Sequence, residues 1–152
     1  MTRDNPVQYR IIGAVWFALG ALLVAGALYL FPAVESGRFS AAVLFVFLPG
    51  LAALLVGAWL GPRLLDPRRS GPWKAIGLGL LAVVLIHLVF SLLFTLVWWP
   101  LNPEPANMPG LALATLIIGF AMVSPVTLPA GALGGWLLYW LGRSRREREQ
   151  VT

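Results

Sequence analysis

Residues 75–99 read AIGLGLLAVVLIHLVFSLLFTLVWW and contain no Asp, Glu, Lys or Arg. A helix needs about 20 mostly apolar residues to cross the hydrocarbon core of a bilayer. Within that core the backbone must satisfy its own hydrogen bonds, so a helix is the default conformation. We therefore predict that this segment crosses a membrane as a helix.

Three further stretches share this property, because residues 11–34, 39–62 and 105–142 are also free of charged side chains. The predicted spans are about 11–31, 41–61, 75–99 and 111–141. Four all-apolar helices in a soluble protein would have no polar shell to cover them. We predict an all-α, four-helix transmembrane bundle that forms one integral membrane domain over residues 1–152.

The composition excludes several classes of protein. Hydrophobic residues make up 59% of the chain and charged residues 11%, whereas a soluble domain carries about 25% charged residues. This balance argues against a cytosolic globule, a disordered tail and a nucleic-acid-binding module. There is no cysteine, so disulfides, thiolate metal sites and cysteine nucleophiles are excluded. No predicted span contains a carboxylate, and Asp4 and Asp66 lie at the ends of spans, away from His87. We therefore predict no enzymatic activity, no metal and no cofactor.

The fourth apolar stretch is too long for one straight crossing. Its roughly 31 residues would extend about 46 Å at 1.5 Å per residue. Pro125 and Pro129 lie inside it, and proline removes a backbone donor and disfavours helix in the preceding residue. We predict a kinked or broken helix, with two short crossings as the alternative.

Basic residues predict the orientation. Ten of the 11 Lys and Arg residues fall on one side of the predicted membrane: Arg3, Arg10, Arg63, Arg68, Arg69, Lys74, Arg143, Arg145, Arg146 and Arg148. Only Arg38 falls on the other side. Short cytoplasmic loops carry the excess of Lys and Arg, so both termini are predicted to be cytoplasmic.

The compact loops are typical of a multi-pass protein of the bacterial cytoplasmic (inner) membrane. The net charge of +5 then indicates contact with anionic lipid headgroups rather than with nucleic acid.

The N-terminal segment has a second interpretation. Arg3 and Arg10 precede an apolar run that contains Ala25-Gly26-Ala27, which resembles a cleavable signal peptide. Cleavage would leave three crossings and place the new N-terminus outside. The apolar run continues to Phe31, which is longer than a usual signal-peptide core, so we favour an uncleaved span.

The two halves of the chain show a similarity that predicts two parallel-repeat hairpins. Residues 9–13 (YRIIG) correspond to residues 73–77 (WKAIG) at the start of each half. In the second span of each half, a Leu-Pro pair precedes a Trp-Leu-Gly triplet. Leu48-Pro49 and Trp59-Leu60-Gly61 thus correspond to Leu128-Pro129 and Trp140-Leu141-Gly142. Both hairpins would run in the same sense about an axis along the membrane normal. Pro49, Pro125 and Pro129 are the predicted helix kinks.

Small residues recur at helical spacing in three of the spans. The predicted packing seams consist of Ala14, Ala18, Ala21, Ala25, Gly50, Ala53, Gly57, Gly61, Gly131 and Gly135. Helices in lipid pack closely where small residues let their backbones approach. These seams can serve the bundle itself or a partner helix.

His87 is the one titratable side chain near the middle of a span. Ser91 and Thr95 follow at i+4 and i+8 on the same helix face, and Ser124 and Thr127 of the fourth stretch complete a candidate mid-membrane polar site. An ionisable group at this depth is a functional hypothesis. His87 could relay protons, contact a substrate, or ligate heme together with Met122 or a partner. The alternative is a neutral imidazole held by the hydroxyl of Ser124 or Thr127.

These features predict a small membrane protein that acts as a non-enzymatic helical subunit or assembly factor. Its partners would be the lipid bilayer and other membrane helices, in a homo-oligomer or a larger complex. One alternative is a small oligomeric transporter or channel with its pathway near His87 and the proline kinks. A further alternative is a heme- or quinone-associated redox subunit.

Overall fold

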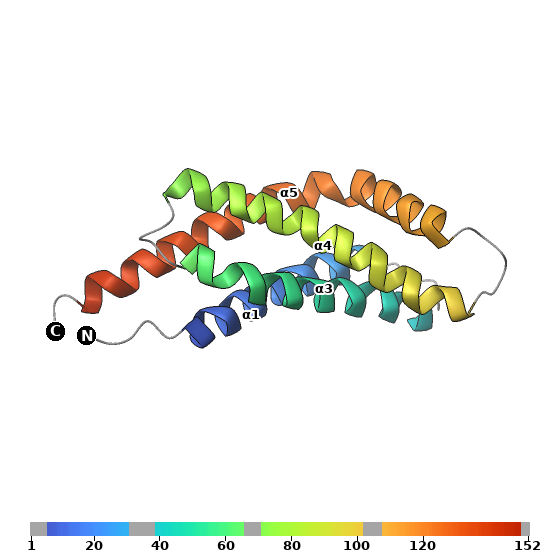
Figure 1. Ribbon diagram of the computed structural model, residues 1–152, viewed down its shortest axis with the longest axis horizontal. Helices are drawn as coiled ribbons and strands as arrows, with labels where there is room; N and C mark the ends of the chain where they lie inside the picture. The colour runs from blue at the N-terminus through green and yellow to red at the C-terminus, as the bar shows by residue number, and fades with distance from the viewer. Residues whose placement is uncertain (1–5, 31–38, 66–70, 102–107, 150–152) are drawn as a thin grey trace.

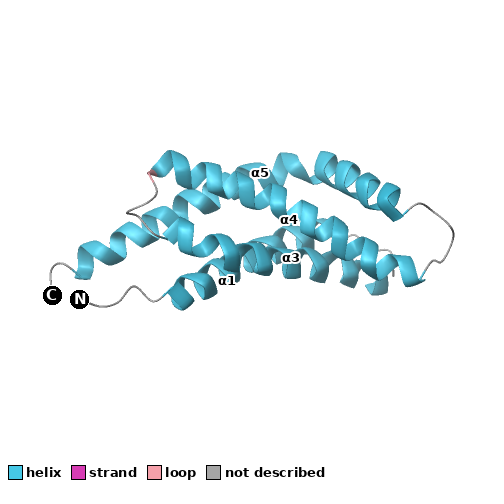
Figure 2. Ribbon diagram, viewed as in Figure 1, coloured by secondary structure: helices cyan, strands magenta, loops and turns pink. Residues whose placement is uncertain are grey.

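The computed structural model describes residues 6–30, 39–65, 71–101 and 108–149. Apart from Gly71, these residues are helical, and none of them is in a strand (Figure 2). The helices are α1 (Pro6–Ala25), its π-helical continuation η1 (Gly26–Leu30), α3 (Phe39–Leu65), α4 (Pro72–Leu101) and α5 (Met108–Glu149). The four long helices run along the long axis of the molecule (Figure 1). The prediction of an all-α, four-helix bundle is confirmed.

Each long helix contains an apolar segment that is long enough to cross a membrane. These segments are Val7–Leu28, Phe45–Leu65, Pro72–Trp98 and Met108–Leu141. They overlap the four predicted spans. Large apolar side chains cover the outside of the bundle, and Leu23 and Met122 are 74% and 75% exposed. A bilayer is the solvent that suits such a surface.

Helix α5 is one continuous helix of 42 residues with Pro125 and Pro129 inside it. Figure 1 shows that it bends near its middle, in the part drawn orange. Proline removes an i→i−4 hydrogen bond and its ring presses on the preceding turn, which bends a helix without ending it when the flanking turns continue. The structure therefore agrees with one kinked helix, and the alternative of two separate short crossings does not apply.

The first hairpin, α1 with α3, closes on three glycines. A Cβ atom placed on Gly57 would lie 2.5 Å from the carbonyl oxygen of Gly13, and one on Gly61 would lie 2.5 Å from that of Tyr9. Real Cβ atoms do not approach a carbonyl oxygen so closely. The two backbones can therefore touch only because these residues lack side chains.

The second hairpin, α4 with α5, closes in the same way. A Cβ atom on Gly79 would overlap the carbonyl oxygen of Gly131, and one on Gly135 would overlap that of Ala75. In both hairpins one glycine of the first helix packs against a G-x-x-x-G pair of the second helix. The two hairpins thus share one mode of helix contact.

The sequence alignment of the halves, however, has the wrong register. It paired Gly13 with Gly77 and Gly61 with Gly142, whereas the packing makes Gly79 the counterpart of Gly13 and Gly135 the counterpart of Gly61. The errors are two residues (79 − 77) and seven residues (142 − 135). Trp-Leu-Gly and Ile-Gly recur by chance in apolar sequence, but only one register brings backbones into contact.

The predicted seams serve the chain's own packing. None of the ten seam residues is exposed, and Ala53 has no exposed surface. Gly50 lies against Leu22, whose Cδ2 would be 2.9 Å from a Cβ atom on the glycine. The seam glycines Gly57, Gly61, Gly131 and Gly135 therefore pack within the chain, whereas Ala18 and Ala21 keep part of their surface exposed.

The two hairpins meet mainly through α3 and α4, whereas α1 and α5 have little contact. Leu60, Leu64 and Leu138 are completely buried. Leu60 and Leu64 lie near the end of α3, on the side of the bundle where α1 begins and α5 ends (Figure 1). Helices α1 and α4 begin, and α3 and α5 end, on this side of the bundle (Figure 1). The described basic residues toward these four helix ends are Arg10, Arg63, Lys74 and Arg143. Buried residues also occur farther along, among them Ala25, Ser91 and Thr95.

Candidate functional site

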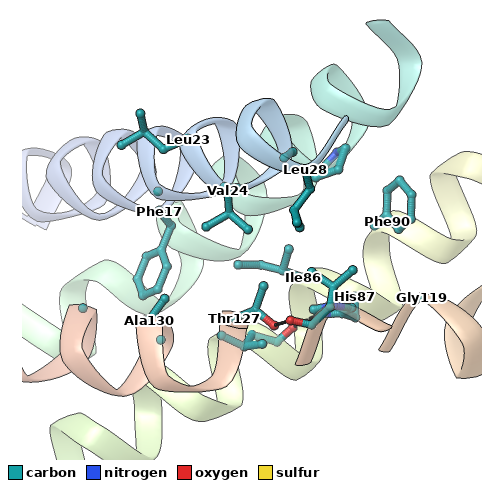
Figure 3. A pocket seen from close by; sticks show the side chains of 18 of the residues that line it. Phe17, Leu23, Val24, Leu28, Ile86, His87, Phe90, Gly119, Thr127 and Ala130 are labelled. Carbon is teal, nitrogen blue, oxygen red and sulfur yellow. Dashed lines mark hydrogen bonds between the residues drawn. The ribbon is translucent and has the colours of Figure 1, made fainter. Parts of the chain in front are cut away.

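A groove of about 320 Å³ lies between the two hairpins (Figure 3). Phe17, Val24 and Leu28 line it from α1 and η1, while Ile86 and His87 line it from α4. Helix α5 completes the walls. The groove exists because the hairpins join along α3 and α4, which leaves α1 and α5 apart.

The groove opens sideways, between α1 and α5. Leu23 and Gly20 of α1 and Ala130 of α5 are lining residues that are also exposed on the outside of the bundle. At one point the two helices approach each other, where the indole nitrogen of Trp16 would be 3.4 Å from a Cβ atom on Gly134. A molecule dissolved in the bilayer could therefore enter without crossing the headgroup layer.

The walls of the groove are almost entirely apolar. Among the described lining residues, only Trp16, His87 and Thr127 have side chains that carry a polar atom. The Thr127 hydroxyl donates to the carbonyl oxygen of Val123 at 3.1 Å, within its own helix. The described residues contain no group of three or more His, Cys, Asp or Glu that could hold a metal ion. The polar ring groups that the groove offers to a ligand are thus the indole N–H of Trp16, which is a donor, and the imidazole of His87.

His87 has a defined hydrogen-bonding state. Its Nδ1 lies 2.9 Å from the carbonyl oxygen of Val83, one turn earlier in α4. A carbonyl oxygen only accepts, so Nδ1 carries the hydrogen and donates it. The ring also meets Phe120 of α5 edge to face, with 5.2 Å between centroids. Nε2, at the far side of the ring, has no hydrogen-bond partner among the described residues, and in the neutral imidazole it is an acceptor.

The structure separates the five predicted polar site residues. His87 and Thr127 line the groove, whereas Ser91, Thr95 and Ser124 do not. The Ser91 hydroxyl donates to the carbonyl oxygen of Ala112 at 2.5 Å and so joins α4 to α5. The Thr95 hydroxyl donates to the carbonyl oxygen of Ser91 at 2.8 Å. The expected hydroxyl partner of His87 is replaced by the Val83 carbonyl, which the ring reaches within its own helix.

The three predicted kinks also differ in position. Pro49 of α3 lines the groove, while Pro125 and Pro129 are exposed on α5 and do not. Met122, named as a second heme ligand, is 75% exposed and also lies off the groove, so it does not face His87 across it.

Sequence reasoning missed most of the groove. Phe17, Val24, Phe90 and Gly119 line it, yet nothing in the sequence distinguishes them from apolar residues that face lipid. The spacing of apolar residues shows no polar face in these helices, so only the spatial arrangement of the hairpins reveals which side chains converge.

Comparison with protein families, with curated proteins and with solved structures finds no match for this chain. The class of protein therefore follows from the molecule itself. The chain is a multi-pass membrane protein built from two helical hairpins, with an apolar groove between them.

Proposed function

We propose that this protein is a non-enzymatic helical subunit or assembly factor of a membrane complex. The observation that supports this most is the outer part of α5. None of the residues from 108 to 130 is buried in the chain's own bundle, whereas half of the apolar segment of α3 is buried. This part of α5 is held mainly by α4.

The free side of α5 can receive another membrane helix. Gly110, Ala114 and Ala121 are exposed there and follow each other at spacings of four and seven, which places them on one helix face. Small residues permit close packing of helices in lipid. The G-x-x-x-G pairs cannot serve this purpose, since both are already occupied inside the hairpins.

We further propose that the protein resides in the bacterial cytoplasmic membrane with both termini in the cytoplasm. The gathering of Arg10, Arg63, Lys74 and Arg143 at one end of the bundle supports this orientation. Arg63 also lies over the exposed ring of Trp59, 4.9 Å from its centroid, a pairing that suits the headgroup layer.

Crosslinking in native membranes tests the role of α5. The chain has no cysteine, so a cysteine introduced by Ile117→Cys or Met122→Cys is the one site at which the crosslinker can react. Leu19 and Leu23 on α1 are matched controls, because they are similarly exposed at 55% and 74%. We expect a discrete crosslinked product from the α5 positions and none from α1. A product of twice the chain mass identifies a homo-oligomer, and another mass identifies a larger complex.

The proposal fails if the α5 and α1 cysteines give the same products, or if no product forms and the purified protein is a monomer.

The transporter alternative rests on the presence of Pro49 and His87 in the same groove. An aqueous ion pathway needs polar groups along its length, and the lining supplies only three polar side chains. Flux through reconstituted protein that is unchanged by His87→Ala and Pro49→Ala would count against transport.

A further inference from the structure

We propose that the groove binds the ring of a membrane-dissolved phenol or hydroquinone, whose hydroxyl group donates a hydrogen bond to Nε2 of His87. This site is separate from the outer face of α5, so it goes beyond the proposed role in a complex.

The size and shape of the groove suit a substituted ring. An apolar cavity of about 150 Å³ is large enough to bind benzene. The volume here is about 320 Å³, which leaves room for a ring with several substituent atoms. The opening beside Leu23 and Ala130 allows an attached hydrocarbon tail to remain in the bilayer.

The walls favour an aromatic occupant. Trp16, Phe17 and Phe90 bring three aromatic rings to the groove, and His87 adds a fourth flat side chain. Aromatic pairs in offset or edge-to-face arrangements gain energy beyond that of area burial alone.

The direction of the hydrogen bond selects a donor. Because Nδ1 of His87 already donates to Val83, a neutral ring presents an acceptor at Nε2. A phenol or hydroquinone hydroxyl donates to this atom, whereas an ether or an oxidised quinone offers only acceptors. An unpaired acceptor in apolar surroundings costs free energy, so a ligand that satisfies it is preferred. The described part of the lining contains no Lys or Arg, so the groove does not suit a carboxylate or phosphate.

Histidine nitrogen NMR tests this directly, since His87 is the only histidine in the chain. Protein labelled with ¹⁵N-histidine would be placed in lipid nanodiscs and titrated with 4-nonylphenol or with 4-nonylanisole, its methyl ether. We expect Nδ1 to be the protonated nitrogen, and the phenol to move the Nε2 resonance upfield while the ether leaves it in place. The ether should also bind about tenfold more weakly, which is the contribution of one hydrogen bond.

Two glycine variants provide matched controls. Gly119 lines the groove and Gly77 does not, and a Cβ atom at either position would have nothing within 4 Å. Gly119→Phe should fill the groove and abolish the phenol response, whereas Gly77→Phe should retain it. His87→Phe should bind the phenol and the ether equally, as measured by competition for a radiolabelled phenol.

The proposal is overturned if Nδ1 is the unprotonated nitrogen, if the phenol and the ether move Nε2 equally or not at all, or if Gly119→Phe responds as Gly77→Phe does. None of these outcomes depends on crosslinking at α5, so this proposal and the proposed function can fail independently.

Discussion

Ser91 and Thr95 are both buried hydroxyl residues on one face of α4, but the acceptors of their hydrogen bonds lie on different helices. Ser91 donates to the backbone of another helix, while Thr95 donates within its own helix. The i, i+4 spacing in the sequence was sufficient to place them with His87 on one face. It could not show which of them meets α5, because that depends on how the bent α5 approaches α4.

Replacing Ser91 by alanine should therefore destabilise the protein more than replacing Thr95 by valine. We expect Ser91→Ala to lower the free energy of unfolding by about 0.6 kcal/mol, the average for such bonds between membrane helices. Thr95→Val should have a smaller effect, because it removes only a bond within α4. Unfolding by SDS in mixed micelles measures both. Equal effects, or a larger loss for Thr95→Val, would contradict the assigned role of Ser91.

Within each hairpin the two helix backbones approach most closely at glycines. The G-x-x-x-G spacings at Gly57/Gly61 and Gly131/Gly135 predicted the positions of close contact correctly. The partners of these pairs, Gly13 and Gly79, were absent from the predicted seams. A single glycine in an apolar helix carries no spacing signal, so its role becomes visible only in the packed hairpin.

Gly79 and Gly77 give a sharp test, since they lie two residues apart on α4 and differ in surroundings. Gly79→Ala places a methyl group against the Gly131 carbonyl oxygen and should separate α4 from α5, at a cost of about 1–3 kcal/mol. Gly77→Ala meets open space and should leave stability unchanged or raise it by up to ~1 kcal/mol through helix propensity.

Unfolding by SDS in mixed micelles measures the stability of both variants. On α1 it repeats the comparison: Gly13→Ala should destabilise the protein, and Gly20→Ala should be tolerated. If the alanine variants of Gly77 and Gly79 unfold alike, the backbone contact does not stabilise the second hairpin.

The whole molecule is a bundle whose spans were predictable from the absence of charge, because lipid imposes length and helicity on any crossing segment. The bend of α5 was predictable from its length and its two prolines. The groove was not predictable from the sequence. It forms because α3 and α4 join the hairpins while α1 and α5 have little contact, and no single segment carries that information. Some charged residues that support the predicted orientation and the absence of a span carboxylate lie outside the described residues: Arg3, Arg38, Arg68, Arg69, Asp4 and Asp66.

Cysteine labelling tests the proposed orientation. A membrane-impermeant maleimide added to intact cells should modify Ser36→Cys, between the first two spans. It should reach Ser70→Cys, between the second and third, only after permeabilisation. The cysteine-free chain serves as the blank. The reverse pattern would invert the orientation, and equal labelling of both positions in intact cells would contradict the four-crossing layout.

The small contact between α1 and α5 has a consequence for the lipid around the molecule. The described residues leave the groove uncovered beside Leu23 and Ala130, and α1 reaches α5 near Trp16 and Gly134. In a bilayer the neighbour on that side is an acyl chain, so a ligand that enters the groove has to displace lipid.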